Sequence, residues 1–402
     1  AWYGDEHLIL DFPDDWTVGT FRPDDAPAID DHAIADAFDR PIESERIEDL
    51  ARACAAKGTC TVGIAVDDIS RPTPAARLFP PLMQRLEAGG VDLDDVWVVM
   101  GIGMHRPMMK DGIVKKIGRD AADRLDVTNN TPYDNLTDFG VSERGTPIKV
   151  CREFGAADLK IGIGGILPHS GPGFGGGAKV VFPGVASYET VTSMHEPDRL
   201  TLGLANVESN ELRDEIEAMG RRIGLDFIIN AVTNSRREIA GLFTGDFVAA
   251  HRAGVALART AYATSMPEAP VDVAICNAYP KDTDYLQAGL ALNILKSAEL
   301  AGQPALKPGG TAVIVTASPE GRGYHMVYGP GMIYSHTDED WRDHPRTFDD
   351  QPLVYFSPAL TVQDARHPFT FRQWEDVIAY VSERYDHPDV AVFPCGALQL
   401  AK

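Results

Sequence analysis

The sequence predicts an α/β protein of two domains, each with a mostly parallel sheet flanked by helices. Two observations predict this class. Short apolar runs that end at Gly, Asp or Pro alternate with segments of helical periodicity. The chain also has 402 residues, 44% of them hydrophobic, which is enough for two cores at roughly 100–200 residues per domain.

The expected strands follow one another along the chain with helical segments between them. Such short, continuous apolar runs are typical of parallel strands that are buried on both faces. They occupy residues 61–66, 96–100, 158–166, 225–234, 271–280 and 311–321. Residues 245–263 are expected to form a long helix, and residues 284–300 another.

A weakly patterned, proline-containing link at residues 264–271 marks the expected domain boundary. We therefore expect an N-terminal α/β domain of residues 1–266, rejoined by the C-terminal segment 391–402. Residues 267–390 would form the C-terminal α/β domain.

The composition excludes several classes of partner. With 37 basic against 59 acidic residues, the formal net charge is −22. Such a surface repels nucleic acids and anionic membranes, so neither is expected as a main partner. The chain contains no apolar run long enough to cross a bilayer. Its five cysteines include no CxxC pair, and the first 16 residues do not resemble a signal peptide. These features predict reduced thiols in a cytoplasmic protein.

Polar side chains follow three of the expected strands. Ligands of open α/β sheets bind beyond the carboxyl ends of the strands, where Asp68, Arg71, His105, Arg106 and His169 fall. A single histidine is more often a hydrogen-bonded structural residue, and Arg71 could simply pair with Asp68 where a helix begins. Their shared position makes a common site an equally good interpretation.

Two histidines in one site suit a particular type of chemistry. Histidine can give or take a proton near neutral pH, and two facing histidines could serve the two faces of one carbon atom. This is what a racemase or epimerase requires. A nearby arginine would bind a carboxylate through two hydrogen bonds.

A glycine-rich stretch, residues 168–179 with the sequence PHSGPGFGGGAK, places five glycines between His169 and Lys179. It fails the Walker pattern because Val180, and not Ser or Thr, follows the lysine, and its glycine spacing departs from the dinucleotide fingerprint. Glycines still allow a bulky ligand to approach the backbone closely. Lys179 could bind a phosphate, or act as a nucleophile if desolvated. The alternative is a plain turn with an exposed lysine.

His195 follows Lys179 by sixteen residues, without an HExxH motif or a Cys/His cluster. A metal carried by an organic cofactor, with one histidine added, suits this pattern better than a site made of protein side chains alone.

Taken together, these motifs resemble the nickel-pincer-dependent lactate racemase family of 2-hydroxyacid racemases and epimerases. The matching parts are Asp68-x-x-Arg71-Pro72, GMHRPM at 103–108, residues 162–190 and His195. Further similarity lies in residues 2–16, 279–289 and 319–323, so the resemblance covers most of the chain. It implies an active site in the cleft between the two domains.

The resemblance implies a cofactor, the nickel-pincer nucleotide, which is a pyridinium-3-thioamide-5-thiocarboxylic acid mononucleotide that carries nickel. Lys179 would match the lysine that binds it covalently through a thioamide, and His195 the protein ligand of the nickel. Asp68 would contact the cofactor, as would the glycine loop at Gly175, Gly176 and Gly177. Enzymes of cofactor synthesis are the implied partners.

The resemblance also implies a mechanism. His105 and His169 would be the acid/base pair. One histidine removes the hydroxyl proton of a 2-hydroxy acid while a hydride leaves the second carbon for the cofactor. The hydride then returns to the other face and the second histidine supplies a proton. Arg71 would orient the substrate. A hydroxy-acid lyase or dehydratase on the same scaffold, or a non-catalytic protein that binds a sugar acid or nucleotide, are the alternatives.

One departure from the family concerns the substrate. Family lactate racemases carry Gln-x-x-Lys in the second domain, whereas this chain has Gln287 followed by Leu290. Losing a charged hydrogen bond to a carboxylate costs about 1.5–3 kcal/mol. We therefore expect a larger or more apolar 2-hydroxy acid than lactate, with Gln287, Leu290 and Tyr279 among its contacts.

Overall fold

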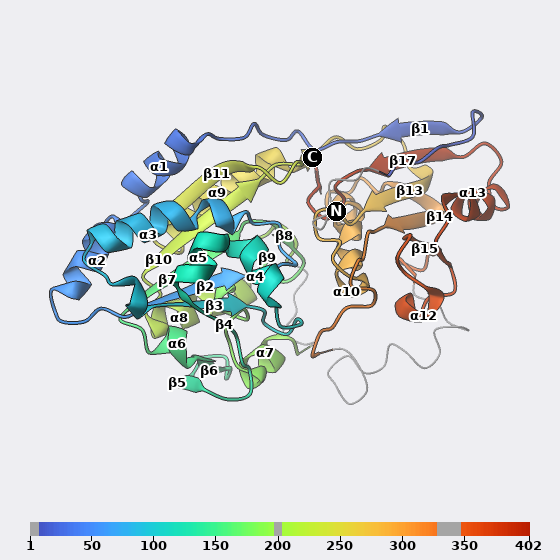
Figure 1. Ribbon diagram of the computed structural model, residues 1–402. Coiled ribbons are helices and arrows are strands. Elements are labelled where there is room, and N and C mark those ends of the chain that lie inside the picture. The colour runs from blue at the N-terminus through green and yellow to red at the C-terminus, as the bar shows by residue number, and fades with distance from the viewer. Residues whose placement is uncertain (1–7, 197–202, 328–346) are drawn as a thin grey trace. The chain divides into compact units, whose positions relative to one another are not determined.

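The computed structural model describes residues 8–196, 203–327 and 347–402. The chain divides into two compact units (Figure 1). The larger unit contains residues 26–258, and the smaller contains residues 1–25 and 259–402. Each unit is an α/β structure on a mostly parallel sheet, which confirms the predicted fold class.

The larger unit has a six-stranded sheet in the order β11-β10-β7-β2-β3-β4. Only the β10–β11 pair is antiparallel. The strands are β2 (Val62–Asp67), β3 (Val96–Gly101), β4 (Asp126–Asn129), β7 (Leu159–Gly165), β10 (Phe227–Thr233) and β11 (Ile239–Gly245). Because β3 and β4 extend the sheet from one side of β2, and β7 and β10 from the other, the strand order reverses between β2 and β7. Ligands of such sheets bind at this switch point.

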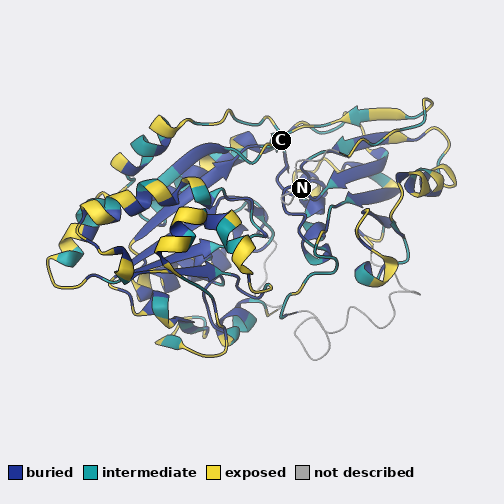
Figure 2. Ribbon diagram, in the orientation of Figure 1, coloured by how far each residue is buried: buried dark blue, intermediate teal, exposed yellow. Residues whose placement is uncertain are grey.

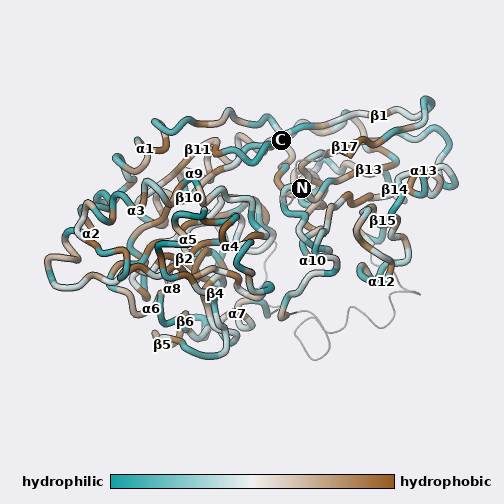
Figure 3. The backbone as a smooth tube through the Cα atoms, viewed as in Figure 1, coloured by the Kyte–Doolittle hydropathy of each residue, from teal (hydrophilic) through white to brown (hydrophobic). Residues whose placement is uncertain are grey.

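Helices cover both faces of this sheet. One face packs its large apolar side chains, such as Ile64 and Ile161, against the first five helices. These are α1 (Asp31–Asp39), α2 (Ile47–Ala55), α3 (Phe79–Ala88), α4 (Lys110–Ile117) and α5 (Arg119–Arg124). Figures 2 and 3 show the strands as the buried, largely apolar part of the unit. The two short 3₁₀ helices on this side are η1 (Ala75–Arg77) and η2 (Leu93–Asp95).

The other face carries small residues that allow close approach. A Cβ on Gly162 of β7 would lie 2.6 Å from Val180, and one on Gly63 of β2 would lie 3.0 Å from Ala157. Elements on this side are α6 (Arg152–Gly155), η3 (Gly177–Val180), α7 (Tyr188–Met194), α8 (Glu211–Ile223) and α9 (Ala249–Ala261). Two hairpins complete the unit, formed by β5 (Leu136–Val141) with β6 (Pro147–Cys151) and β8 (Pro168–His169) with β9 (Gly173–Phe174).

The smaller unit has an all-parallel sheet in the order β1-β17-β13-β14-β15-β16. Its strands are β1 (Thr17–Thr20), β13 (Val271–Asn277), β14 (Leu306–Val315), β15 (Leu353–Phe356), β16 (Thr370–Phe371) and β17 (Asp389–Phe393). A short pair joins β12 (Ala263–Thr264) to β18 (Leu400–Ala401). The helices are α10 (Tyr285–Ala288), η5 (Gly289–Leu292), α11 (Asn293–Leu300), α12 (Val362–Ala365) and α13 (Trp374–Ser382).

The observed division differs from the expected boundaries in the two terminal segments and at the internal boundary, where residues 259–266 belong to the smaller unit. Residues 1–25 and 391–402 were expected in the larger domain, but both belong to the smaller unit. Strand pairing explains this, since β1 adds to the edge of β17 and β18 pairs with β12. Pairing between segments so distant in sequence leaves no local signal.

Two local expectations were wrong. Residues 284–300 form α10, η5 and α11 instead of one helix, and the break begins at Gly289, a residue that weakens helices. Cys54 and Cys60 form a disulfide, whereas Cys151, Cys276 and Cys395 are free thiols. The turn from α2 into β2 brings the Cα atoms of the bonded pair to 5.5 Å, within the usual range for a disulfide.

None of the helices in the described part of the chain has the length and apolar content that spanning a membrane requires.

Candidate functional site

The switch point of the larger unit gathers the polar residues predicted to follow the strands. Asp68 comes directly after β2, and His105 follows β3 by four residues. His169 ends β8, just beyond β7. The carboxyl ends of these parallel strands lie at one edge of the sheet, so the three side chains share that edge.

Asp68 binds His105. The Nδ1 atom of His105 lies 2.5 Å from the Oδ2 atom of the buried Asp68. The Oδ1 atom of Asp68 accepts hydrogen bonds from the amide and hydroxyl of Ser70, at 3.1 and 2.5 Å. Since a carboxylate can only accept, Nδ1 of His105 carries a proton, and in the neutral form of the ring the lone pair is on Nε2. Asp68 thus orients a histidine.

The charge balance around Asp68 favours its ionised form. Burial alone would raise the pKa of this carboxyl. The charge and hydrogen bond of His105 outweigh burial, together with the Arg71 charge and the Ser70 hydroxyl, so the pKa is lowered from its usual value. The guanidinium of Arg71 also donates to the Ser70 hydroxyl at 2.8 Å. Arg71 therefore acts in this network through Ser70 and through its charge.

Asp67, which we had not singled out, fixes the loop that carries Asp68 and Arg71. Its Oδ2 atom accepts from the Thr73 hydroxyl at 2.5 Å and from the Gly165 amide at 3.0 Å, which joins the ends of β2 and β7. Its Oδ1 atom lies 2.6 Å from the ammonium of the buried Lys116. That ammonium also donates to the Arg71 carbonyl at 3.0 Å.

His169 has the opposite hydrogen-bond arrangement to His105. Its Nδ1 atom accepts from the Gly171 amide at 3.1 Å. The proton of the neutral ring is therefore on Nε2. In their neutral forms the two histidines thus differ at Nε2, which has a lone pair in His105 and carries a proton in His169.

The glycine loop is a buried, tightly packed segment. This differs from the alternative interpretation of the sequence, a plain turn with an exposed lysine. Nearly all of residues 171–178 are buried. Gly176 has φ +75°, and a Cβ there would lie 2.7 Å from the Asn230 side-chain oxygen. A Cβ on Gly175 would lie 2.7 Å from the Gly165 carbonyl. The glycines, including Gly177, therefore allow the loop to pack against protein atoms.

Lys179 lies in η3, directly after this loop, and is half-buried. Burial lowers the pKa of its amine from 10.5 to about 7, and the positive charges of Arg71 and Arg213 add to the effect. The carboxylates of Asp68 and Asp67 oppose it. A lysine with such a pKa has a substantial neutral fraction at physiological pH, as a nucleophilic amine requires.

Lys179→Met is expected to stabilise the protein without ligands at neutral pH. The unfavourable charge of Lys179 begins to reduce the free energy of unfolding as the pH falls below 10.5, and the full reduction is present below about 7. The gain of the variant should therefore be large near pH 7 and shrink toward pH 10.5, which urea unfolding at several pH values would measure. The exposed Lys110→Met is the control; equal stability of Lys179→Met and wild type at pH 7 would contradict the prediction.

His195 caps the C-terminal end of α7 and is suited to bind a metal through one nitrogen. Its Nδ1 atom lies 2.7 Å from the Val191 carbonyl and so carries a proton, which leaves the lone pair on Nε2. Burial lowers the pKa of the ring; the Val191 contact opposes this, while the charges of Lys179 and His105 lower the pKa further. The ring is therefore neutral at pH 7, and His195 lies within electrostatic reach of both residues.

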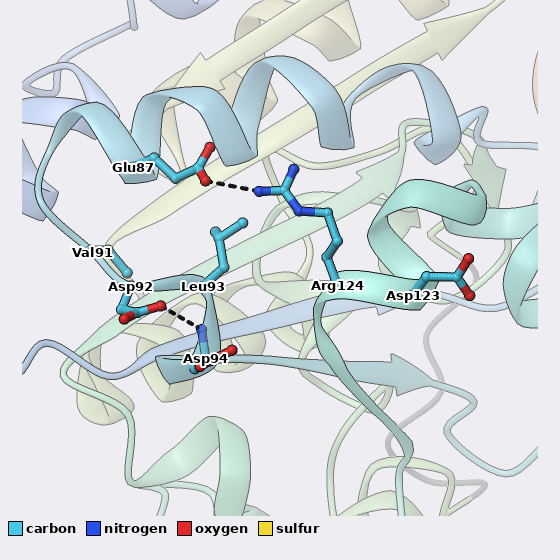
Figure 4. A pocket seen from close by; sticks show the side chains of 7 residues that line it. All are labelled: Glu87, Val91, Asp92, Leu93, Asp94, Asp123 and Arg124. Atoms are coloured by element: carbon cyan, nitrogen blue, oxygen red, sulfur yellow. Dashed lines mark hydrogen bonds and ion pairs between the residues drawn. The ribbon is translucent and has the colours of Figure 1, made fainter.

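Two further observations concern other places for a ligand in the described residues. No group of three or more His, Cys, Asp or Glu in these parts of the chain is arranged to hold a metal ion. A hollow near the start of β3 is lined mainly by acids (Figure 4). There Glu87 pairs with Arg124 at 2.8 Å and Asp92 accepts from the Asp94 amide at 3.1 Å. It lies at the amino end of β3, whereas His105 follows the carboxyl end.

Comparison with known proteins shows similarity to lactate racemases. Residues 3–201 match the lactate racemase N-terminal domain. The lactate racemase of Lactiplantibacillus plantarum is 29% identical over 327 residues, which are 80% of this chain and 72% of that protein. The lactate racemase of Thermoanaerobacterium thermosaccharolyticum is 24% identical over 335 residues, 81% of this chain and 76% of that protein. Residues 3–201 are therefore similar to the N-terminal domain of lactate racemases.

Solved structures show the same fold. The lactate racemase apoprotein from Thermoanaerobacterium thermosaccharolyticum superimposes with a TM-score of 0.75 at 21% identity, over 99% of this chain and 98% of that one. A protein from Thermotoga maritima, solved by a structural genomics consortium, gives a TM-score of 0.63 at 18% identity. This second match covers 90% of this chain and all of the other.

The three residues expected to contact the substrate lie in the smaller unit. Tyr279 follows the carboxyl end of β13 and is half-buried, with its amide donating to the Asn277 side chain at 3.1 Å. Gln287 is buried in α10, which Asp284 caps, and Leu290 is half-buried in η5. The chain therefore places Leu290 one helical turn after Gln287, where the resemblance led us to expect a lysine.

Several supporting residues were missed in the sequence. The position of Asp67 beside Asp68 at the end of β2 was a usable signal. Other supports come from helices and strands that carry no motif. Asn129 binds both the amide and the carbonyl of Met108, at 2.8 and 3.0 Å, and so fixes the loop after His105. Arg213 of α8 and His251 of α9 bind the glycine loop.

Proposed function

We propose that this protein is a racemase or epimerase that inverts the second carbon of a 2-hydroxy acid with a covalently bound nickel-pincer nucleotide. The observation that carries this proposal is the lowered pKa of Lys179 at the switch point. Lys179 lies within electrostatic reach of the neutral His195, which in turn lies within reach of His105, the histidine bound by Asp68. The relation to lactate racemases supports the reaction type. The details of substrate and cofactor are part of the proposal.

The residues suit this cofactor. Lys179 would form the covalent bond, since its pKa of about 7 provides a neutral amine. His195 would offer Nε2 to nickel, because its Nδ1 proton is bound to Val191, and metal-binding histidines usually donate their second nitrogen in this way. When bound, the cofactor would supply a hydride acceptor that later returns the hydride.

The proton transfers fall to His105 and His169. In the neutral tautomer that Asp68 favours, His105 can accept the hydroxyl proton of a substrate at Nε2, and Asp68 would stabilise the positive charge that results. His169 would serve the opposite face and supply the proton to the oxygen when the ketone is reduced again. Arg71, half-buried at the same edge, would bind the substrate carboxylate.

The substrate is proposed to be a 2-hydroxy acid larger or more apolar than lactate. Leu290 replaces the family lysine, so a carboxylate loses one cation and an apolar side chain gains a contact. Gln287 and Tyr279 would be further contacts. The proposal makes the enzymes of cofactor synthesis its partners. A cytoplasmic location stays a prediction, since the Cys54–Cys60 disulfide removes the argument from reduced thiols.

The test is a screen of enantiopure 2-hydroxy acids, lactate included, with protein produced together with the cofactor-synthesis enzymes and nickel. Chiral chromatography and mass spectrometry should find inversion without a change of mass, faster for a larger or more apolar acid than for lactate. Protein made without the cofactor is the control. Loss of water would indicate a lyase or dehydratase, and tight binding without turnover a binding protein. Either result would refute the proposal.

A further inference from the structure

Five carbonyl groups of the glycine loop accept hydrogen bonds from side chains of α8, of its N-cap residue Asn210 and of α9. The guanidinium of Arg213, which is fully buried, donates to three of them. Its Nε atom binds the Pro172 carbonyl at 3.1 Å and its Nη1 atom the Gly176 carbonyl at 3.2 Å, while Nη2 binds the Phe174 carbonyl. Asn210 adds a bond of 2.7 Å to the Gly171 carbonyl.

The Gly175 carbonyl is bound through a relay of charged and polar groups, whereas the Gly173 carbonyl accepts from the Ala205 amide at 3.2 Å. Glu217 forms two hydrogen bonds with Arg252, at 2.8 and 3.1 Å. Arg252 donates to Nδ1 of His251 at 3.0 Å, which places the ring proton on Nε2. That Nε2 atom donates to the Gly175 carbonyl at 2.8 Å. Burial lowers the pKa of His251 well below its usual value, so the ring stays neutral as the relay requires.

The position of Lys179 depends directly on this set of contacts. The Gly176 carbonyl that binds Arg213 also accepts the Lys179 amide at 3.2 Å. From β10, the Asn230 side chain accepts a hydrogen bond from the Gly177 amide at 2.6 Å. The turn that carries Lys179 is thus fixed at its first two residues. Unbound, the buried carbonyls would each cost about 1–3 kcal/mol.

We infer that Arg213 is a positioning residue for Lys179, which fixes the turn bearing its amine and places a positive charge close to that amine. The role of Lys179 as the cofactor anchor rests on the proposed function. The contacts between Arg213 and the glycine loop do not depend on that proposal. The charged groups that act on Lys179 come from two sides. Asp67 ends β2, Asp68 and Arg71 follow it, and Arg213 belongs to α8. The neutral ring of His195, at the end of α7, also lies within electrostatic reach. Arg213 therefore acts on the reactive amine both through the loop and through its charge.

The test measures the reactivity of Lys179 in protein made without cofactor. Acetic anhydride labelling over a range of pH, read by peptide mass spectrometry, gives the titration midpoint of its amine, expected at about 7 in the wild type. In Arg213→Met the midpoint should rise by about one pH unit, the order expected for removing one nearby charge. Arg222→Met, on the exposed side of the same helix, is the matched control.

Two further variants separate the two actions of Arg213. Arg213→Lys retains the charge, so the midpoint should stay within a few tenths of a unit of the wild type. It loses the planar fork, so the amides of residues 173–177 should exchange with deuterium at least tenfold faster. His251→Ala removes one neutral hydrogen bond and should speed exchange with the midpoint unchanged.

The inference is overturned if folded Arg213→Met keeps the wild-type midpoint, because a purely structural role would lower only the melting temperature. If that variant does not fold, the other two decide, and unchanged exchange in both overturns the inference. Cofactor attachment is scored separately, by the intact mass of protein made with the cofactor-synthesis enzymes. An unmodified Lys179 there would refute the proposed function, while the labelling result would still judge the role of Arg213.

Discussion

Protein with Lys179→Ala, produced together with the cofactor-synthesis enzymes and nickel, is expected to carry no covalent adduct and to show no turnover above background. The physical reason is that the adduct requires a neutral amine at the edge of the sheet where substrate chemistry takes place. Lys179 meets both conditions, with a pKa lowered to about 7 and a place directly after the glycine loop. Alanine retains the turn and removes the nucleophile.

Intact-mass spectrometry measures the adduct, and chiral chromatography measures turnover. Lys160→Ala is a matched control, since Lys160 is also a buried lysine whose pKa is lowered by burial. It lies near the start of β7, where its ammonium donates to the Ala157 carbonyl at 2.6 Å, whereas the site lies beyond the other end of that strand. Lys160→Ala should therefore keep the adduct. If Lys179→Ala kept it too, the covalent role of Lys179 would be wrong.

The strands and the edge that carries the site were predictable from the sequence. The apolar runs at residues 61–66, 96–100 and 158–166 correspond to β2, β3 and β7 within one or two residues. Strand alternation with helices implied a parallel sheet, and the strand-end rule then selected Asp68, His105 and His169. The strands and the positions of these residues after them were predicted correctly, because each depends on a short stretch of sequence and on a general property of parallel sheets. The catalytic roles of these residues stay a prediction.

The contacts that set the chemistry were not predictable, because each joins residues far apart in the chain. Asp68 was expected to contact the cofactor, and its bond to His105 spans 37 residues. Arg213 reaches the glycine loop across as many as 41 residues. A helix surface with Arg, Glu and His looks like an exposed face in the sequence. Only the fold shows that α8 and α9 direct these groups inward.

Asp68→Asn is expected to lower kcat by a factor on the order of 10²–10⁴, the usual contribution of a general acid or base. The amide is nearly isosteric, so the variant should fold, but neither orientation of the amide reproduces all the contacts of the carboxylate, and both lose its charge. If the amide nitrogen faces the ring, Nδ1 must accept, the proton moves to Nε2 and the ring cannot take a proton there. If the amide nitrogen faces Ser70, it opposes the Ser70 N–H donor, which binds Oδ1 at 3.1 Å in the wild type.

The variant therefore separates the orientation of His105 from the binding of cofactor and substrate. We expect kcat to fall while the intact mass still shows the adduct on Lys179, because Lys179 does not bond to Asp68 among the contacts described here. The negative charge of Asp68 raises the pKa of that amine. Removing this charge should therefore favour the neutral form of the amine. Asp111→Asn, an exposed carboxylate on α4, is the control and should leave kcat unchanged. If Asp68→Asn keeps more than a third of the wild-type kcat, His105 does not rely on the carboxylate for its tautomer. If the variant loses the adduct, Asp68 is instead a contact of the cofactor.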